Sequence, residues 1–97
     1  MKEYLPAGSV VRLAGAERNL IIVGIIQASE DDPDTVHDYL GFPYPQGYMG
    51  PNNNYLFDET DIEEVVFRGY EDEDHEKLMQ FVDLAQSLIA ENSASHA

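Results

Sequence analysis

The sequence predicts an α+β fold: a mainly antiparallel sheet of four to five strands with one C-terminal helix packed on it. Short runs of β-branched and aromatic residues alternate with turn formers between residues 9 and 68. A single apolar stripe with helical spacing follows at residues 78–89. The 97 residues suit one domain, which we expect to span residues 1–92 and to end in a flexible tail at 93–97.

The first two strands are predicted to form a hairpin. Residues 9–13 alternate β-branched and polar residues, and residues 14–18 supply the turn. Residues 20–27 form a β-branched run without polar alternation, which is typical of a central strand covered on both faces. Gly24 inside this run indicates a bulge or the close approach of another backbone.

The middle of the chain contributes an exposed loop and a third strand. Residues 29–35 have no apolar member, so we expect a mobile surface loop there. Residues 36–44 place large apolar side chains at alternate positions, as in a strand with one buried face. Pro43 has no N–H to donate, which places the end of this strand at a sheet edge or beyond the paired region.

Two short strands and an ordered loop complete the predicted sheet. Residues 45–54 are rich in Pro, Gly and Asn and predict the loop. Residues 55–57 and 62–68 are the fourth and fifth strands, joined by a turn at 58–61.

The C-terminal element is predicted to be a helix because six apolar residues recur at helical spacing. They are Leu78, Phe81, Val82, Ala85, Leu88 and Ile89. Carboxylates at residues 71–74 precede the stripe, where they can cap free backbone N–H groups. An exposed stripe of this length would invite aggregation, so we expect it to dock on the sheet. A small SH3-like barrel with an added helix is the second possible architecture.

The charge of the chain limits the classes of partner. Five Lys and Arg against 19 Asp and Glu give a net charge of −14 and a pI near 4.1. Such a surface repels phosphate backbones and anionic lipids, so we expect binding to neither nucleic acid nor membrane. A basic protein partner is the natural complement, and an acidic surface that only keeps the protein in solution is the alternative.

No motif of catalysis is present. His37, His75 and His96 lie in no recognisable motif, and there is no cysteine to act as nucleophile or zinc ligand. The acidic runs at 30–34 and 58–63 could offer oxygen ligands to calcium or magnesium, but they lack the spacing of an EF-hand loop. No phosphate-binding glycine motif occurs. We therefore expect no enzyme activity, no catalytic residue, no metal site and no cofactor.

The N-terminal segment lacks an apolar signal region, and the longest apolar run is far too short to cross a bilayer. These two features predict a cytoplasmic location.

Residues 39–57 hold six of the ten aromatic residues and predict a binding surface. Tyrosines on a loop rich in Pro and Gly cannot all be buried, and protein interfaces favour exposed Tyr on a rigid turn. Packing of each Tyr over its own loop is the alternative. The candidate partner-binding residues are Tyr44, Tyr48 and Met49, with Asp72 and Asp74 as contacts to a basic partner.

Three ordered motifs within residues 4–82 carry a family resemblance. They are Leu5-Pro6-x-Gly8-Ser9-Val10-Val11-x-Leu13, then Asp38-Tyr39-Leu40-Gly41 with Tyr44-Pro45-x-Gly47, then Phe57-x-x-x-Asp61-Ile62-x-x-Val65-Val66-Phe67-x-Gly69-Tyr70. Together they resemble a family of short proteins of unknown function from Gram-positive bacteria, encoded in type VII secretion loci near LXG toxins.

The resemblance implies a cytoplasmic accessory or targeting factor that assists toxin export by protein contact and without catalysis. Its partner would be an LXG-type toxin or the small helical accessory proteins of such a toxin. An immunity protein that neutralises a toxin is the second hypothesis, and a small metal-dependent enzyme is the third.

Overall fold

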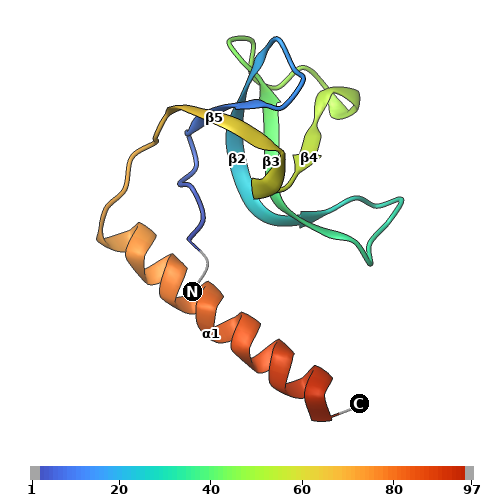
Figure 1. The fold of residues 1–97 in the computed structure, drawn as a ribbon, viewed down its shortest axis with the longest axis vertical. Coiled ribbons are helices and arrows are strands. Elements are labelled where there is room, and N and C mark those ends of the chain that lie inside the picture. Colours follow the sequence, from blue (N-terminus) through green and yellow to red (C-terminus); the bar gives the residue numbers. More distant parts are fainter. Residues whose placement is uncertain (1–2, 96–97) are drawn as a thin grey trace. The chain divides into compact units, whose positions relative to one another are not determined.

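The computed structural model describes residues 3–95, which form two compact units. Residues 5–70 make up the first unit and contain every described strand (Figure 1). Residues 3–4 and 71–95 belong to the second unit, which contains the helix α1, Glu73–Ser95.

The first unit is one antiparallel sheet with the order β4-β3-β2-β1-β5. Its strands are β1 Val10–Leu13, β2 Asn19–Ala28, β3 Val36–Pro43, β4 Tyr55–Phe57 and β5 Ile62–Phe67. The 3₁₀ turns are η1, Pro51–Asn53, and η2, Glu59–Asp61. The predicted α+β class, with five antiparallel strands and one C-terminal helix, is confirmed.

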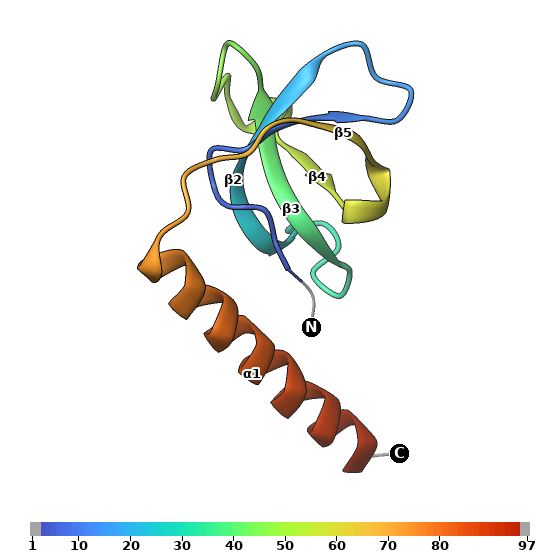
Figure 2. The same cartoon turned by 60° about the vertical axis from the view of Figure 1, so that its left-hand side comes forward.

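The sheet is strongly curled. Its first four strands form a meander, and the last returns to pair with the first. β5 runs at a steep angle to β3 in both views of the ribbon (Figures 1 and 2). Closure of this sheet into a small SH3-like barrel, the second possible architecture, stays a prediction.

The core lies on one face of the sheet. Buried hydrophobic residues on this face are Val11, Leu20, Ile22, Tyr39 and Phe57. The rings of Tyr39 and Phe57 lie 5.5 Å apart between centroids, and the Tyr39 hydroxyl accepts a hydrogen bond of 2.9 Å from the backbone N–H of Leu5. That bond gives the buried hydroxyl a partner, which a Tyr in a core requires.

The bulge expected near Gly24 is present. The pairing of β2 with β3 shifts register between Ile22 and Gly24, so the side chains of β2 change faces at this point. The expectation that β2 is covered on both faces is wrong, because Val23 and Ile26 are exposed. A β-branched run shows that a strand is apolar, but it does not reveal what covers the second face. The loop side chains at 30–35 are exposed, as predicted.

The residues of the second unit leave the predicted apolar stripe of α1 uncovered. Phe81 is 68% exposed, and Leu78 and Leu88 are also exposed. The docking of this stripe on the sheet stays a prediction. The buried apolar residue on the described part of α1 is Val82. One turn further on, the side-chain amide of Gln86 donates a hydrogen bond of 2.9 Å to the hydroxyl of Tyr4. The helix is apolar over a wide arc, and spacing alone did not identify the covered side.

The helix also extends beyond residue 92. Residues 93–95, expected in the flexible tail, are helical, and the rest of that tail, residues 96–97, lies outside the described residues. Nothing is described for the side chain of Ile89, the last member of the predicted stripe. Among the residues that the structure describes, no helix combines the length and apolar character needed to cross a membrane.

Candidate partner-binding site

An apolar groove of about 440 Å³ lies on the first unit, and we call it the Tyr44 groove. It is lined by Gly8, Val10, Asn19, Ile21, Tyr44, Val66 and Phe67. Successive strand residues point to opposite faces, so Val10 and Ile21 lie on the face opposite their buried neighbours Val11, Leu20 and Ile22. The groove therefore lies on the face of the sheet opposite the one that holds Val11, Leu20 and Ile22.

A bulge in β5 brings two consecutive residues to this groove. Val10 pairs with Phe67 and Val11 pairs with Val65, which leaves Val66 as an extra residue on β5. In a regular strand, Val66 and Phe67 would point to opposite faces, and the extra residue re-aims one of them. Both residues line the groove, and Phe67 is 61% exposed.

Tyr44 is held at the opposite side of the groove by backbone contacts. Its N–H donates a hydrogen bond of 3.1 Å to the carbonyl of Asn19 at the start of β2. The following turn is closed by a bond of 2.6 Å from the Gly47 N–H to the Pro43 carbonyl. Gly47 has a φ of +80°, which favours glycine over residues with a side chain. Tyr44 is exposed, as the sequence predicted, and its position is fixed by the sheet.

Tyr48 and Met49 are exposed on the same loop but do not line the groove. The Tyr48 side chain is 62% exposed, and its ring centroid lies 5.3 Å from that of Phe42. The ring therefore packs against the end of β3 and still presents most of its surface, and partner binding by Tyr48 stays a prediction. Met49 contributes its carbonyl, which accepts a bond of 3.0 Å from the Asn53 side chain.

Asp72 and Asp74 belong to the second compact unit. The carboxylate of Asp72 accepts a hydrogen bond of 3.1 Å from the His75 N–H, so Asp72 caps the start of α1. This contact confirms the predicted capping by the carboxylates at 71–74. Asp74 lies in the first turn of α1 and is exposed.

Several other carboxylates also accept backbone hydrogen bonds. Asp58 accepts from the N–H of Asp38, Asp38 accepts from the N–H of Glu59, and Asp61 accepts from the N–H of Asp58, each at 2.9 Å. The Asp58 side chain also lies 3.3 Å from Nδ1 of His37. This part of the acidic run therefore holds the turn between β4 and β5 in place, a role that the sequence analysis did not assign.

Arg12 pairs with two carboxylates of β5. Its guanidinium lies 2.6 Å from Glu63 and 3.4 Å from Glu64. The hydrogen bond and the charge of Glu63 raise the pKa of Arg12 above its ordinary value, and Glu64 adds to the shift. The charge of this end of β5 is thus partly balanced within the sheet.

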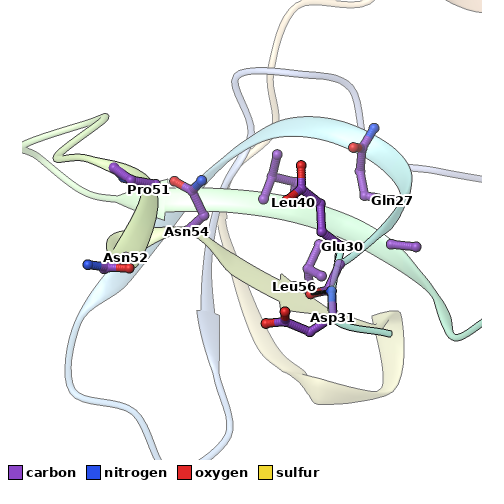
Figure 3. A pocket seen from close by; sticks show the side chains of 10 residues that line it. Gln27, Glu30, Asp31, Leu40, Pro51, Asn52, Asn54 and Leu56 are labelled. Carbon is purple, nitrogen blue, oxygen red and sulfur yellow. Dashed lines mark hydrogen bonds between the residues drawn. The ribbon is translucent and has the colours of Figure 1, made fainter. Parts of the chain in front are cut away.

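A second hollow, of about 530 Å³, is polar (Figure 3). Glu30 and Asp31 lie on one side of the view, and Asn52 and Asn54 lie on the other. Within residues 3–95 no group of three or more His, Cys, Asp or Glu side chains is placed to hold a metal ion. The hollow therefore offers hydrogen-bonding groups without a described metal centre.

A family model described as Domain of unknown function (DUF4176) matches residues 4–78. The match includes every described strand and the Tyr44 groove, and it ends within the second turn of α1. No curated protein matches the chain, and no solved structure matches it.

Proposed function

We propose that this chain, which belongs to the DUF4176 family, is a non-catalytic protein-interaction module that binds its partner in the Tyr44 groove. In the cell it would serve as a cytoplasmic accessory or targeting factor for export of a toxin by type VII secretion. The cellular role comes from the sequence resemblance, and the binding mode comes from the groove.

The observation that carries the proposal is the pair of exposed aromatic residues, Tyr44 and Phe67, on an open apolar groove. Exposed apolar patches mark interaction sites, and aromatic side chains supply much of the binding energy of protein interfaces. Among the described residues that line it, Asn19 and the Tyr44 hydroxyl supply the polar side-chain groups. Small-molecule sites are concave and bury most of their ligand, so the apolar side chains of a protein suit this open groove better.

The groove is also preorganised. Val10 is buried, the Tyr44 backbone is bonded to β2, and Val66 and Phe67 sit on a paired strand. Binding then costs little ordering of the protein, which favours affinity. The net charge of −14 favours a basic partner, because opposite charges speed the association of two proteins.

The test uses two neighbouring valines as a matched pair. Val65 and Val66 are exposed to nearly the same extent, at 46% and 47%, but Val66 lines the groove and Val65 does not. The proposed partner is an LXG toxin. Its N-terminal and catalytic segments are expressed separately, and their affinities for this chain are measured by calorimetry. We expect the N-terminal segment to bind, and Val66→Ser to weaken binding about tenfold while Val65→Ser changes it less than about threefold.

Other outcomes would change the conclusion. Binding to the catalytic segment, with loss of toxicity, would identify an immunity protein. Equal effects of the two substitutions would remove the groove as the site, and binding to neither segment would overturn the proposed role in secretion.

A further inference from the structure

The polar hollow of about 530 Å³ in Figure 3, which we call the Leu40 hollow, is built wholly from residues of the first unit. Its floor and walls therefore do not depend on α1. It shares no described lining residue with the Tyr44 groove. The hollow and the groove are thus two separate sites, and an inference about the hollow does not rest on the proposed function of the groove.

The floor of the hollow is apolar. Leu40 and Leu56 lie directly opposite each other on β3 and β4, and both are half-buried. The partner of Leu40 on β2 is Gly24, which has no side chain to fill the space beside it. The Gln27 side chain lies over Gly24, because a Cβ atom there would be 3.3 Å from the Gln27 amide nitrogen. The hollow therefore combines two leucines at its base with an amide at its side.

The amide of Gln27 is held in one orientation. Its nitrogen donates a hydrogen bond of 3.0 Å to the Ile25 carbonyl, which leaves the amide oxygen to accept a bond from a ligand. Ile26, between these two residues, has a φ of +55°, where a β-branched residue is strained. The three residues that follow, 27–29, all line the hollow. Strain of this kind persists where a functional geometry depends on it.

Two short turns form the walls of the hollow. In the first wall, the Ser29 hydroxyl accepts a hydrogen bond of 3.1 Å from the N–H of Asp31, which holds the turn that carries Glu30 and Asp31. The second wall is η1 with the residue after it, and it carries Asn52 and Asn54. In Figure 3 these carboxylates and amides lie around the two leucines of the floor.

We propose that the Leu40 hollow receives an arginine side chain from a basic segment of a protein partner. The alkyl stem of an arginine suits the leucine floor. Its guanidinium has five N–H donors in a fixed plane, which suits several carboxylate and amide oxygens at once. The ammonium of a lysine is compact and has three donors, so it reaches fewer of these oxygens. A metal ion is disfavoured, because no group of three or more His, Cys, Asp or Glu side chains within residues 3–95 is placed to hold one.

Charge supports this occupant. Glu30 and Asp31 are exposed, and within residues 3–95 neither has an ion-pair partner. Residues 30–34 hold four carboxylates and no Lys or Arg, so they attract a basic segment. The second unit of this chain is a poor occupant, because Lys77, the one Lys or Arg in its described residues, follows five carboxylates at 71–76. Those carboxylates and the hollow repel each other.

The probe is the tripeptide Gly-Arg-Gly, acetylated and amidated at its ends. Its control replaces arginine with citrulline, which has the same shape and no charge. Binding to the full chain, labelled with ¹⁵N, is measured by nuclear magnetic resonance. We expect the arginine peptide to give saturable shifts at the backbone N–H groups of residues 27–31 and 52–56. The citrulline peptide should bind at least about tenfold more weakly, and Gly-Lys-Gly about threefold more weakly.

Two double variants with the same change in charge test the wall. Glu30→Gln/Asp31→Asn removes both carboxylates that line the hollow. The control, Asp32→Asn/Asp34→Asn, removes the same charge from the same loop outside the described lining. The first should weaken binding of the arginine peptide about tenfold, and the control less than about threefold. Val66→Ser should leave this binding unchanged, which separates the hollow from the groove.

Any of five results would overturn the proposal. No saturable shift with the arginine peptide, equal binding of the citrulline peptide, or equal effects of the two double variants would remove the hollow as an arginine site. Tighter binding of the lysine peptide would replace arginine as the occupant. Stronger binding of the arginine peptide to a Lys77→Gln variant would identify the chain's own Lys77 as the occupant.

Discussion

The carboxylate of Asp72 accepts a hydrogen bond of 3.1 Å from the backbone N–H of His75, three residues further along the chain. This bond satisfies one of the N–H groups that the first turn of a helix leaves unpaired. Asp72 thus stabilises the start of α1, and it also carries one of the charges that we expect to contact a basic partner. The two roles can be separated by substitution.

Asp72→Ala removes both the charge and the cap, whereas Asp72→Asn removes the charge and keeps a good capping residue. We expect Asp72→Ala to lower the stability of α1 by about 1 kcal/mol and Asp72→Asn to lower it much less. Thermal melting followed by circular dichroism at the helical band measures the difference. Equal melting curves for the two variants would show that the His75 contact does not stabilise the helix.

Asp74 allows a cleaner test of charge, because it is exposed in the first turn of α1. If the acidic segment meets a basic partner, Asp74→Asn should slow association, with dissociation little changed. Raising the salt from about 50 mM to about 500 mM should reduce the association rate of the unmodified chain, because salt screens exposed charges. Stopped-flow measurements at both concentrations provide the check. An association rate that is independent of salt would assign these charges to solubility.

Tyr48 tests the loop beside the groove. Its ring touches Phe42, so Tyr48→Ala should cost roughly 0.5–1.5 kcal/mol of stability, the range for an aromatic pair. If Tyr48 also anchors a partner, the same change should reduce affinity by about 1–3 kcal/mol. Tyr48→Phe keeps the ring pair and serves as the control in calorimetry and thermal melting. Lost stability with intact affinity would leave Tyr48 as a residue of the loop alone.

Gly69 packs against backbone and tolerates no side chain. A Cβ atom there would lie 2.8 Å from the Ala7 carbonyl oxygen and 2.9 Å from the Ser9 nitrogen. We expect Gly69→Ala to cost about 1–3 kcal/mol, because backbone would have to move. At Gly24 the nearest atom is the end of the flexible Gln27 side chain, 3.3 Å away, so Gly24→Ala should cost less. Urea unfolding of both variants compares them, and an equal loss would contradict the packing argument.

Phe81→Ala distinguishes a buried from an exposed stripe. Burial of the stripe would make the cost about 3–5 kcal/mol. With Phe81 68% exposed, we expect a change in stability below about 1 kcal/mol. Val82→Ala, at the buried position next to it, should cost more. Thermal melting of the two variants decides, and a larger loss for Phe81→Ala would contradict the observed exposure.

The fold was predictable from the sequence because its signals are local. The β-branched runs, the turn formers between them and the helical spacing after residue 77 each report on a few neighbouring residues. Gly24 correctly indicated the bulge in β2. The covered face of α1 was not predictable, because Val82 and Phe81 are both apolar neighbours and their burial depends on residues distant in the chain. The bond from Gln86 to Tyr4 spans 82 positions and leaves no local pattern.

The candidate site was predicted in part. Tyr44, Tyr48 and Met49 are exposed, as the Pro- and Gly-rich loop indicated. The contribution of Val66 and Phe67 was missed, because alternation along a regular strand places only one of them on a given face. Their shared position depends on the register between β1 and β5, which arises from pairing across more than 50 residues. A bulge without a glycine leaves no signal of this kind in a single sequence.

The irregular pairing of β5 also bears on how the protein avoids forming fibres. β5 is the outermost strand on one side of the described sheet, and its two valines and its phenylalanine are exposed. If this edge were flat, strands of other chains could pair with its free backbone groups. Two register shifts within β5 and the charges of Glu63 and Glu64 interrupt that edge. The outermost strand on the other side, β4, is only three residues long, so it leaves few backbone groups free to pair with another chain. The sheet can therefore display apolar side chains for recognition while its backbone resists polymerisation.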